Sequence, residues 1–300
     1  MRARSSLGGD RDWPGEIQPG LARRVGGQWA FLGPEGGSWV RTRGPDGSDG
    51  NGRGRFRTLG SMVRIVAALL IAYLVVRTLM VLALGDVFFY GEELEKGAVS
   101  LGLLGGTDVS LARLPYHPYE GGGFVASWFK LPFFWLLGPC VLAHKAAAIT
   151  WGLLLLTATV GFVGRHAGRG AAALAGALLI FGPAHFQRES LLHVGIHFES
   201  LLWIAVIFDL GLRVAATPAH ERPSRSLLVG LGLSAGFGSY FSYQVPLAVL
   251  AVIALLARSG WRRIFSPALM VSTVVGLLPL LWMALSVGIE VVDIHGAEVG

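Results

Sequence analysis

Long apolar runs separated by short charged segments dominate the pattern of the chain. From Val63 to Leu84 the charged residues are Arg64 and Arg77 alone, and as a helix this run crosses about 30 Å of hydrocarbon. Further apolar runs that could span a bilayer lie at about 145–163, 170–187, 196–212, 227–243, 244–257 and 268–287. The pattern predicts an all-α fold, a polytopic transmembrane helix bundle of about seven spans.

One further apolar segment, 124–138, allows two interpretations. It contains Lys130 and Pro132, is rich in aromatic residues, and stops at the dipeptide Gly138-Pro139. The segment could cross the bilayer, or it could lie flat at the membrane surface as an interfacial helix. Because the two interpretations reverse the sidedness of every later loop, the distribution of arginine decides between them.

Arginine clusters recur in alternate loops. Arg64 and an arginine-bearing tail place the N-terminus in the cytoplasm and the loop 85–123 outside, because cytoplasmic segments carry an excess of Arg and Lys. If 124–138 is interfacial, later clusters also face the cytoplasm: Arg165 and Arg169, then Arg213, Arg222 and Arg225, then Arg258, Arg262 and Arg263. We therefore expect a multi-pass protein of the cell (inner) membrane with a cytoplasmic N-terminus.

Composition agrees with a membrane protein and sets the first 61 residues apart. The chain is 53% hydrophobic and 15% charged, whereas soluble domains are about 25% charged. Residues 1–61 hold ten arginines and six acids, most of the net charge of +6, and show no apolar period. We expect 1–61 to be a disordered tail, or an extension upstream of a true start at Met62, and 62–300 to be the membrane module. The arginines form no basic run, so we expect no nucleic-acid partner.

The external loop 85–123 concentrates acidic side chains, including the adjacent pair Glu92 and Glu93. The run from Gly91 to Leu101 predicts a short helix that begins at this pair. A carboxylate here could take the proton of an attacking hydroxyl at the membrane surface. Alternatively, the two acids only stabilise the N-terminus of the helix. Tyr119 and Glu120, near the end of the loop, are further candidates for substrate contact.

A second polar segment on the outer side ends with His193, His197 and Glu199. The two histidines are four residues apart, which would place them on one helical face. A zinc motif of the His-Glu-x-x-His type needs a glutamate where Val194 stands, so we expect no metal. These groups instead line a water-filled pocket, or cap a helix at headgroup level.

Three cations lie near the outer interface and could pair with a lipid phosphate. They are Lys130, Lys145 and Arg188. The alternative is that they are anchors whose charged ends reach the interface and fix helix depth. Arg77 lies within the first span, where an unpaired charge is costly, so it needs a partner.

The layout resembles the GT-C superfamily of integral-membrane glycosyltransferases, most of all the protein mannosyltransferase and aminoarabinose transferase-like branch. The similar features are a span, then an acidic external segment at Gly91–Gly106, in which Glu92 stands where an aspartate is usual. The segment Leu131–Pro139 resembles the Pro…Gly-Pro stretch before the second span of that family. Phe181–Pro183 followed by Gly195–Glu199 resembles its junction between the third and fourth spans. The resemblance covers roughly 62–287.

The resemblance implies a transferase that moves a sugar from a polyprenyl-phosphate donor to a glycan, lipid or protein acceptor on the outer face, without a cofactor. Glu92 or Glu93 would be the general base, and the reaction would invert the anomeric carbon. Lys130, Lys145 or Arg188 would hold the lipid phosphate, and His193, His197 and Glu199 the sugar or acceptor. Two alternatives stay open: a transporter or flippase of lipid-linked substrates, and an inactive partial copy of the module.

Overall fold

The computed structural model describes two units, Met1–Gly52 and Arg53–Gly300. The described residues are 23–25, 28–30, 51–84, 90–106, 121–218 and 220–287, and their side chains are described from residue 62 to residue 285. In the first unit, strand β1 (Arg23–Val25) pairs antiparallel with β2 (Gln28–Ala30). The remainder of the tail predicted to be disordered, up to residue 50, lies outside the described residues.

Apart from this two-stranded ribbon, every described element is a helix, which confirms the all-α prediction for the membrane module. The helices are α1 (Asn51–Leu84), α2 (Gly91–Leu104), α3 (Gly122–Leu137), α4 (Val141–His166), α5 (Arg169–Phe181), α6 (Ala184–Glu189), α7 (Ser200–Ala216), α8 (Arg225–Phe241), α9 (Val245–Ser259), η1 (Trp261–Arg263, a 3-10 turn) and α10 (Pro267–Val287). Helix α1 begins at Asn51 rather than near Met62. No proline interrupts the intervening residues, and extending an existing helix adds one hydrogen bond per residue.

Three of these helices have the length and apolar composition needed to cross a membrane. They are Met62–Leu84 in α1, Val141–His166 in α4 and Pro267–Leu285 in α10. Helices α5, α7, α8 and α9 have only 13 to 17 residues, whereas about 20 residues span a typical bilayer. These three helices indicate a membrane protein, and the predicted number of seven spans is not confirmed.

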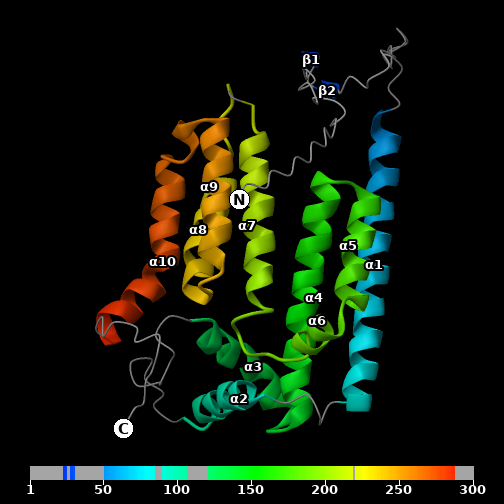
Figure 1. Cartoon of the computed structure of the whole chain (residues 1–300), viewed down its shortest axis with the longest axis vertical. Coiled ribbons are helices and arrows are strands. Elements are labelled where there is room, and N and C mark those ends of the chain that lie inside the picture. Colours follow the sequence, from blue (N-terminus) through cyan, green and yellow to red (C-terminus); the bar gives the residue numbers. More distant parts are fainter. Residues whose placement is uncertain are drawn as a thin grey trace, which may run out of the picture. The chain divides into compact units, whose positions relative to one another are not determined.

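Helices α1, α4, α5 and α7 to α10 run along the long axis in Figure 1, and α2, α3 and α6 gather at one end of the membrane module. The turns that join α4 to α5, α7 to α8 and α9 to α10 lie at the opposite end. The arginine clusters in and beside those turns are therefore separated from the acidic helix α2 by the length of the bundle.

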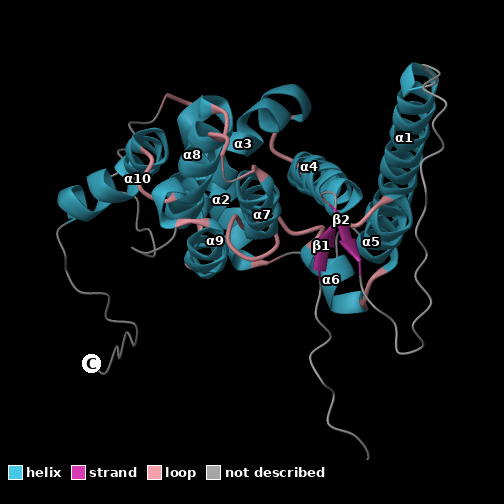
Figure 2. Ribbon diagram, turned by 90° about the horizontal axis from the view of Figure 1, so that it is seen from above, coloured by secondary structure: helices cyan, strands magenta, loops and turns pink. Residues whose placement is uncertain are grey.

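The axial helices pack in two groups, which Figure 2 shows end-on. Helices α7 to α10 share a core that includes Ile207, Leu231 and Val252. Helices α1, α4 and α5 share a second core around Tyr73 and Leu156. Many large apolar side chains on the outer surfaces of both groups are exposed, as expected for helices that face lipid.

Two glycines of α8 allow the backbone of α10 to approach closely. A Cβ atom at Gly232 would lie 2.0 Å from Ser272 Oγ, and one at Gly236 would lie 2.3 Å from the carbonyl oxygen of Thr273. Small residues permit this kind of contact between membrane helices. These two glycines therefore let α8 and α10 pack with their backbones in close approach.

One predicted span, 170–187, is wrong as a continuous helix. Helix α5 ends at Phe181, and the separate short helix α6 starts at Ala184. Pro183 has no N–H to donate and disfavours helical geometry in the residue before it, so the chain breaks at Gly182. This break puts α6 at the same end of the bundle as α2 and α3 (Figure 1).

Candidate functional site

Helix α2 presents a polar face to the bundle. Its buried residues are Glu93, Lys96, Gly97 and Ser100, at the spacing of three and four residues that defines one side of a helix. Three of its four leucines are exposed instead, including Leu94 at 50% and Leu104 at 43%. A helix with charges inward and leucines outward is the opposite of one on a soluble protein.

Close contacts and hydrogen bonds fit α2 against α3 and α4. The Ser100 hydroxyl donates to the carbonyl oxygen of Ser127 in α3 over 2.8 Å. A Cβ atom at Gly97 would lie 2.3 Å from the His144 ring in α4, and one at Gly123 would lie 2.6 Å from Cε of Lys96. The two glycines therefore let α2 sit directly on its neighbours.

The centre of the site is a buried ion pair. Lys145 Nζ in α4 donates to Oε2 of Glu93 over 2.7 Å, and both side chains are 0% exposed. The other carboxylate oxygen, Oε1, accepts the backbone N–H of His193 over 3.2 Å. Glu93 therefore joins α2 to α4 and to the segment before α7, and both of its oxygens are occupied.

Lys130 of α3 is fully buried beside this pair. Its Nζ donates to the backbone carbonyl oxygen of Glu93 over 3.0 Å. An ammonium group has three N–H donors, and this is the single hydrogen bond that the described residues provide. We call Glu93, Lys130, Lys145, His193 and Glu199 the buried cluster.

His193 and Glu199 lie in the buried cluster with polar atoms that have no partner. The His193 ring stacks on Phe129 with centroids 5.4 Å apart and meets the edge of Trp151 at 5.6 Å. The Trp151 indole N–H donates to the backbone oxygen of Glu199 over 3.2 Å. Both ring nitrogens of His193 and Oε1 of Glu199 lack a hydrogen-bond partner among the described residues.

Burial shifts the proton affinities of the groups in this cluster that lie outside the axial helices. Burial raises the pKa of the Glu199 carboxyl from 4.5 to about 7, against backbone N–H groups and Lys130, which lower it. Burial lowers the pKa of Lys130 from 10.5 to about 8, although Glu93 raises it. Burial, and then the charge of Lys130, lowers the pKa of His193 well below 6.5. Near neutral pH, Glu199 is therefore much more readily protonated than an ordinary carboxyl, and His193 is neutral.

The predicted site residues divide into buried and accessible groups. Glu93, Lys130, Lys145, His193 and Glu199 come together in the buried cluster. Helix α2 starts at Gly91, which confirms the short helix predicted at the carboxylate pair. Glu92 is half-buried in its first turn. Arg188 and His197 are exposed. Tyr119 and Glu120 lie outside the described residues.

The prediction that His193 and His197 share a helical face is wrong. The residues from 190 to 199 are turns and bends between α6 and α7, with Gly195 at a φ of +94°. A Cβ atom at Gly195 would lie 2.2 Å from the carbonyl oxygen of Gly122, so the turn is pressed against the start of α3. His193 consequently points into the protein while His197 is exposed. Within the described residues, no three His, Cys, Asp or Glu side chains gather as a metal site would require.

Residues outside the sequence prediction complete the site. Ser100, Ser127 and Trp151 tie its elements together through backbone carbonyls. The sequence contains a signal for Ser100, because it follows Glu93 by seven residues and so lies on the same face of α2. Trp151 carries no comparable pattern, because its partner Glu199 is 48 positions away.

Arg77 and Asp209 are the other buried charges of the axial helices, and both have partners. The Arg77 guanidinium donates to the carbonyl oxygens of Leu179 and Ile180 near the end of α5, at 3.1 and 3.2 Å. Asp209 accepts two hydrogen bonds from Arg165, at 2.9 and 2.8 Å. The partner predicted for Arg77 is therefore the end of a neighbouring helix.

Comparisons with protein-family models, with curated proteins and with solved structures found no match to this chain.

Proposed function

We propose that this protein is a membrane glycosyltransferase that uses a polyprenyl-phosphate sugar as donor. The observation that carries the proposal is the set of unpartnered polar atoms in the buried cluster. Buried polar groups in native proteins are almost always hydrogen-bonded, yet both ring nitrogens of His193 and Oε1 of Glu199 are not. Lys130 has further N–H donors to offer. A sugar, whose hydroxyls both donate and accept, complements this combination of groups.

The end of the bundle that carries α2 is the proposed outer face. The arginine-bearing turns lie at the opposite end (Figure 1), which supports a cytoplasmic location for those turns. The exposed leucines of α2 support a helix that lies in the interface. The shorter axial helices would then complete the seven spans by tilting little or by thinning the bilayer locally.

Hydrogen bonding divides the proposed roles of the two adjacent glutamates. A general base needs a carboxylate oxygen that is free to accept a proton, and both oxygens of Glu93 already accept hydrogen bonds. Glu92 is half-buried at the same helix start, so it is the proposed base. Glu93 then acts as a positioning residue that holds α2 against Lys145. Arg188, exposed on α6, is the proposed contact for the lipid phosphate.

The proposed reaction is a single displacement. The acceptor oxygen forms a bond to the anomeric carbon of the sugar while the bond from that carbon to the phosphate oxygen breaks. Polyprenyl phosphate leaves with the bonding electron pair, and Glu92 accepts the proton of the acceptor hydroxyl. The sugar inverts at the anomeric carbon, and His193, Lys130 and Glu199 would bind its hydroxyls.

The experiment that tests this function compares the wild type with two variants of α2 in reconstituted vesicles. Radiolabelled hexoses and pentoses on polyprenyl phosphate are supplied in the outer leaflet, and transfer to membrane glycan, lipid or protein is counted. We expect Glu92→Gln to lose about 100-fold or more in rate, which is the range for a lost general base. Glu95→Gln is the matched control, because Glu95 is exposed on the same helix and is outside the proposed machinery.

Three results would reject the proposal. One is the absence of transfer from every donor by the wild-type chain. Another is full activity of Glu92→Gln. The third is equal loss in Glu92→Gln and Glu95→Gln, which would point to the charge of α2 rather than to a base. Thermal unfolding of each variant, measured alongside, separates lost chemistry from lost folding.

A further inference from the structure

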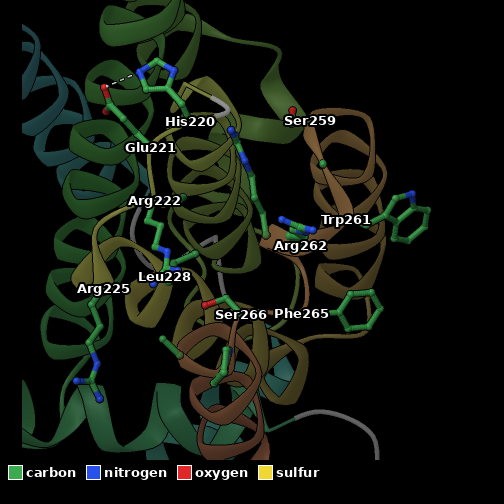
Figure 3. Close-up of a pocket in the computed structure, with 15 residues that line it drawn as sticks. His220, Glu221, Arg222, Arg225, Leu228, Ser259, Trp261, Arg262, Phe265 and Ser266 are labelled. Atoms are coloured by element: carbon green, nitrogen blue, oxygen red, sulfur yellow. Dashed lines mark ion pairs between the residues drawn. The ribbon is translucent and has the colours of Figure 1, made fainter.

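A cavity of about 790 Å3 lies at the end of the bundle opposite α2. The segment that precedes α8 and the segment that joins α9 to α10 form its walls (Figure 3). Its lining includes four arginines and one glutamate: Arg222, Arg225, Arg262, Arg263 and Glu221. The volume is in the range of small-molecule sites, and the charge of its lining favours an anion.

Three of the four arginines are available for a ligand. Arg263 is committed, because its guanidinium donates to the carbonyl oxygens of Val214, Ala215 and Thr217 at the end of α7. Within the part of the chain that the structure describes, the side chains of Arg222, Arg225 and Arg262 make no hydrogen bond or ion pair. The single carboxylate, Glu221, pairs with His220 at 3.5 Å, as the dashed line in Figure 3 marks.

Two helix N-termini add to the positive potential of the cavity. Arg225 is the first residue of α8 and Pro267 the first of α10, and both line the cavity. A helix N-terminus carries a partial positive charge that favours anions. At the start of α8 the Ser224 hydroxyl already accepts the N–H of Leu227, and Pro267 has no N–H, so the contribution is mainly this partial charge. Neither helix has an acidic residue in its first turn to offset that charge.

Two aromatic side chains indicate that the cavity lies at the depth of lipid headgroups. Trp261 and Phe265 are each 63% exposed. In the view of Figure 3 they project outward on one side, while Arg222 and Arg225 lie on the other. Exposed tryptophan rings such as Trp261 are typical of the membrane–water interface, and Phe265 adds an apolar ring beside it. A soluble anion gains nothing from contact with these aromatic rings, whereas a lipid contacts them with its glycerol and upper acyl chains.

We propose that this cavity binds the phosphate group of an anionic phospholipid from the leaflet at the arginine-bearing end of the bundle. The site is separate from the buried cluster, which lies at the other end. Arg222 and Arg262 bind the phosphate at the N-termini of α8 and α10, and Arg225, which points away from them in Figure 3, adds positive charge to the wall of the cavity. Trp261 and Phe265 contact the lipid below its headgroup. The occupant is a membrane component, so the proposal does not depend on sugar transfer.

Native mass spectrometry of the full chain in detergent tests this proposal. The protein is mixed with phosphatidylglycerol and phosphatidylcholine of matched acyl chains, and the affinity for the first bound lipid of each kind is measured. We expect the wild type to prefer phosphatidylglycerol. Arg222→Gln, Arg225→Gln and Arg262→Gln should each weaken that binding about fivefold, and the triple variant about a hundredfold, with phosphatidylcholine binding unchanged.

Arg258→Gln is the matched control, because Arg258 is exposed at the end of α9 but does not line the cavity. It should bind phosphatidylglycerol as the wild type does. Equal weakening by Arg258→Gln would overturn the proposal in favour of diffuse surface charge. Unchanged binding in the triple variant would overturn it as well. Displacement of the lipid by an excess of inorganic phosphate would assign the cavity to a free anion instead.

Discussion

The buried ion pair between Glu93 and Lys145 gives the strictest test of how α2 is held in the site. The two groups are 2.7 Å apart and neither is exposed, so water cannot replace a lost partner. Glu93→Gln leaves the Lys145 ammonium buried without its counter-charge, and Lys145→Gln does the same to the Glu93 carboxylate. Removing one partner of a buried pair typically costs about 3–5 kcal/mol.

The double variant Glu93→Gln/Lys145→Gln should lose much less than the sum of the two single losses. Two amides can hydrogen-bond to each other, and neither leaves an uncompensated charge. Coupling energies between contacting residues reach about 3 kcal/mol, and we expect a value of at least about 2 kcal/mol here. The His193 N–H can still donate to the side-chain oxygen of Gln at position 93, so that contact is common to all variants.

Thermal unfolding in detergent, followed by size-exclusion chromatography of the heated samples, measures this cycle. For a chain of this size about 1 kcal/mol shifts the Tm by about 2–4 °C, so each single variant should unfold about 6–20 °C below the wild type. Glu95→Gln, which alters an exposed contact to Lys96 at 3.5 Å, should change the Tm by little. Additive losses in the double variant would refute the reasoning, as would single variants as stable as the wild type.

Two further predictions concern the turn that leads into α7. Between pH 4.5 and about 7 the folded state binds more protons at Glu199 than the unfolded state, so ionisation of this group destabilises the fold as pH rises. The free energy of unfolding of Glu199→Gln, relative to that of the wild type, should therefore increase by about 3 kcal/mol across this window. Chemical unfolding at each pH measures this difference, and a difference that does not change with pH would contradict the prediction. Gly195→Ala should be more destabilising than Gly138→Ala. Both glycines have positive φ, which costs about 1–2 kcal/mol. Only the Gly195 variant adds a clash with Gly122, worth about 1–3 kcal/mol more, and equal Tm values would contradict this.

The sequence was most informative about the helices and least informative about how they meet. Hydrophobic runs located every axial helix, because a span needs continuous apolar residues whatever packs beside it. The break at Pro183 was missed because the predicted span carried the apolar run before it onward through Ala184 and Phe186 to Gln187. Lys145 was identified as an interfacial cation, but nothing local indicates that its partner is Glu93, 52 positions earlier.

The histidine geometry failed for a related physical reason. A spacing of four residues places two side chains on one face only if the backbone is helical. The turn at Gly195 requires a positive φ that ordinary residues avoid, and its position is fixed by the contact with Gly122 in α3. The sidedness predicted from the arginines depends on charge counts in loops rather than on packing, and it stays a prediction.

The polar inner face of α2 has a thermodynamic consequence. Hydrophobic attraction weakens on cooling and gives unfolding its large heat-capacity change, but α2 buries Glu93, Lys96, Gly97 and Ser100 rather than its leucines. Detachment of α2 from α3 and α4 should therefore add little to the heat capacity of unfolding. The free energy that holds α2 on α3 and α4 should therefore change little on cooling. It should decrease when added salt or a change of pH weakens the interactions between its buried charges. Hydrogen exchange of the α2 amides would then vary with ionic conditions more steeply than exchange in the apolar cores.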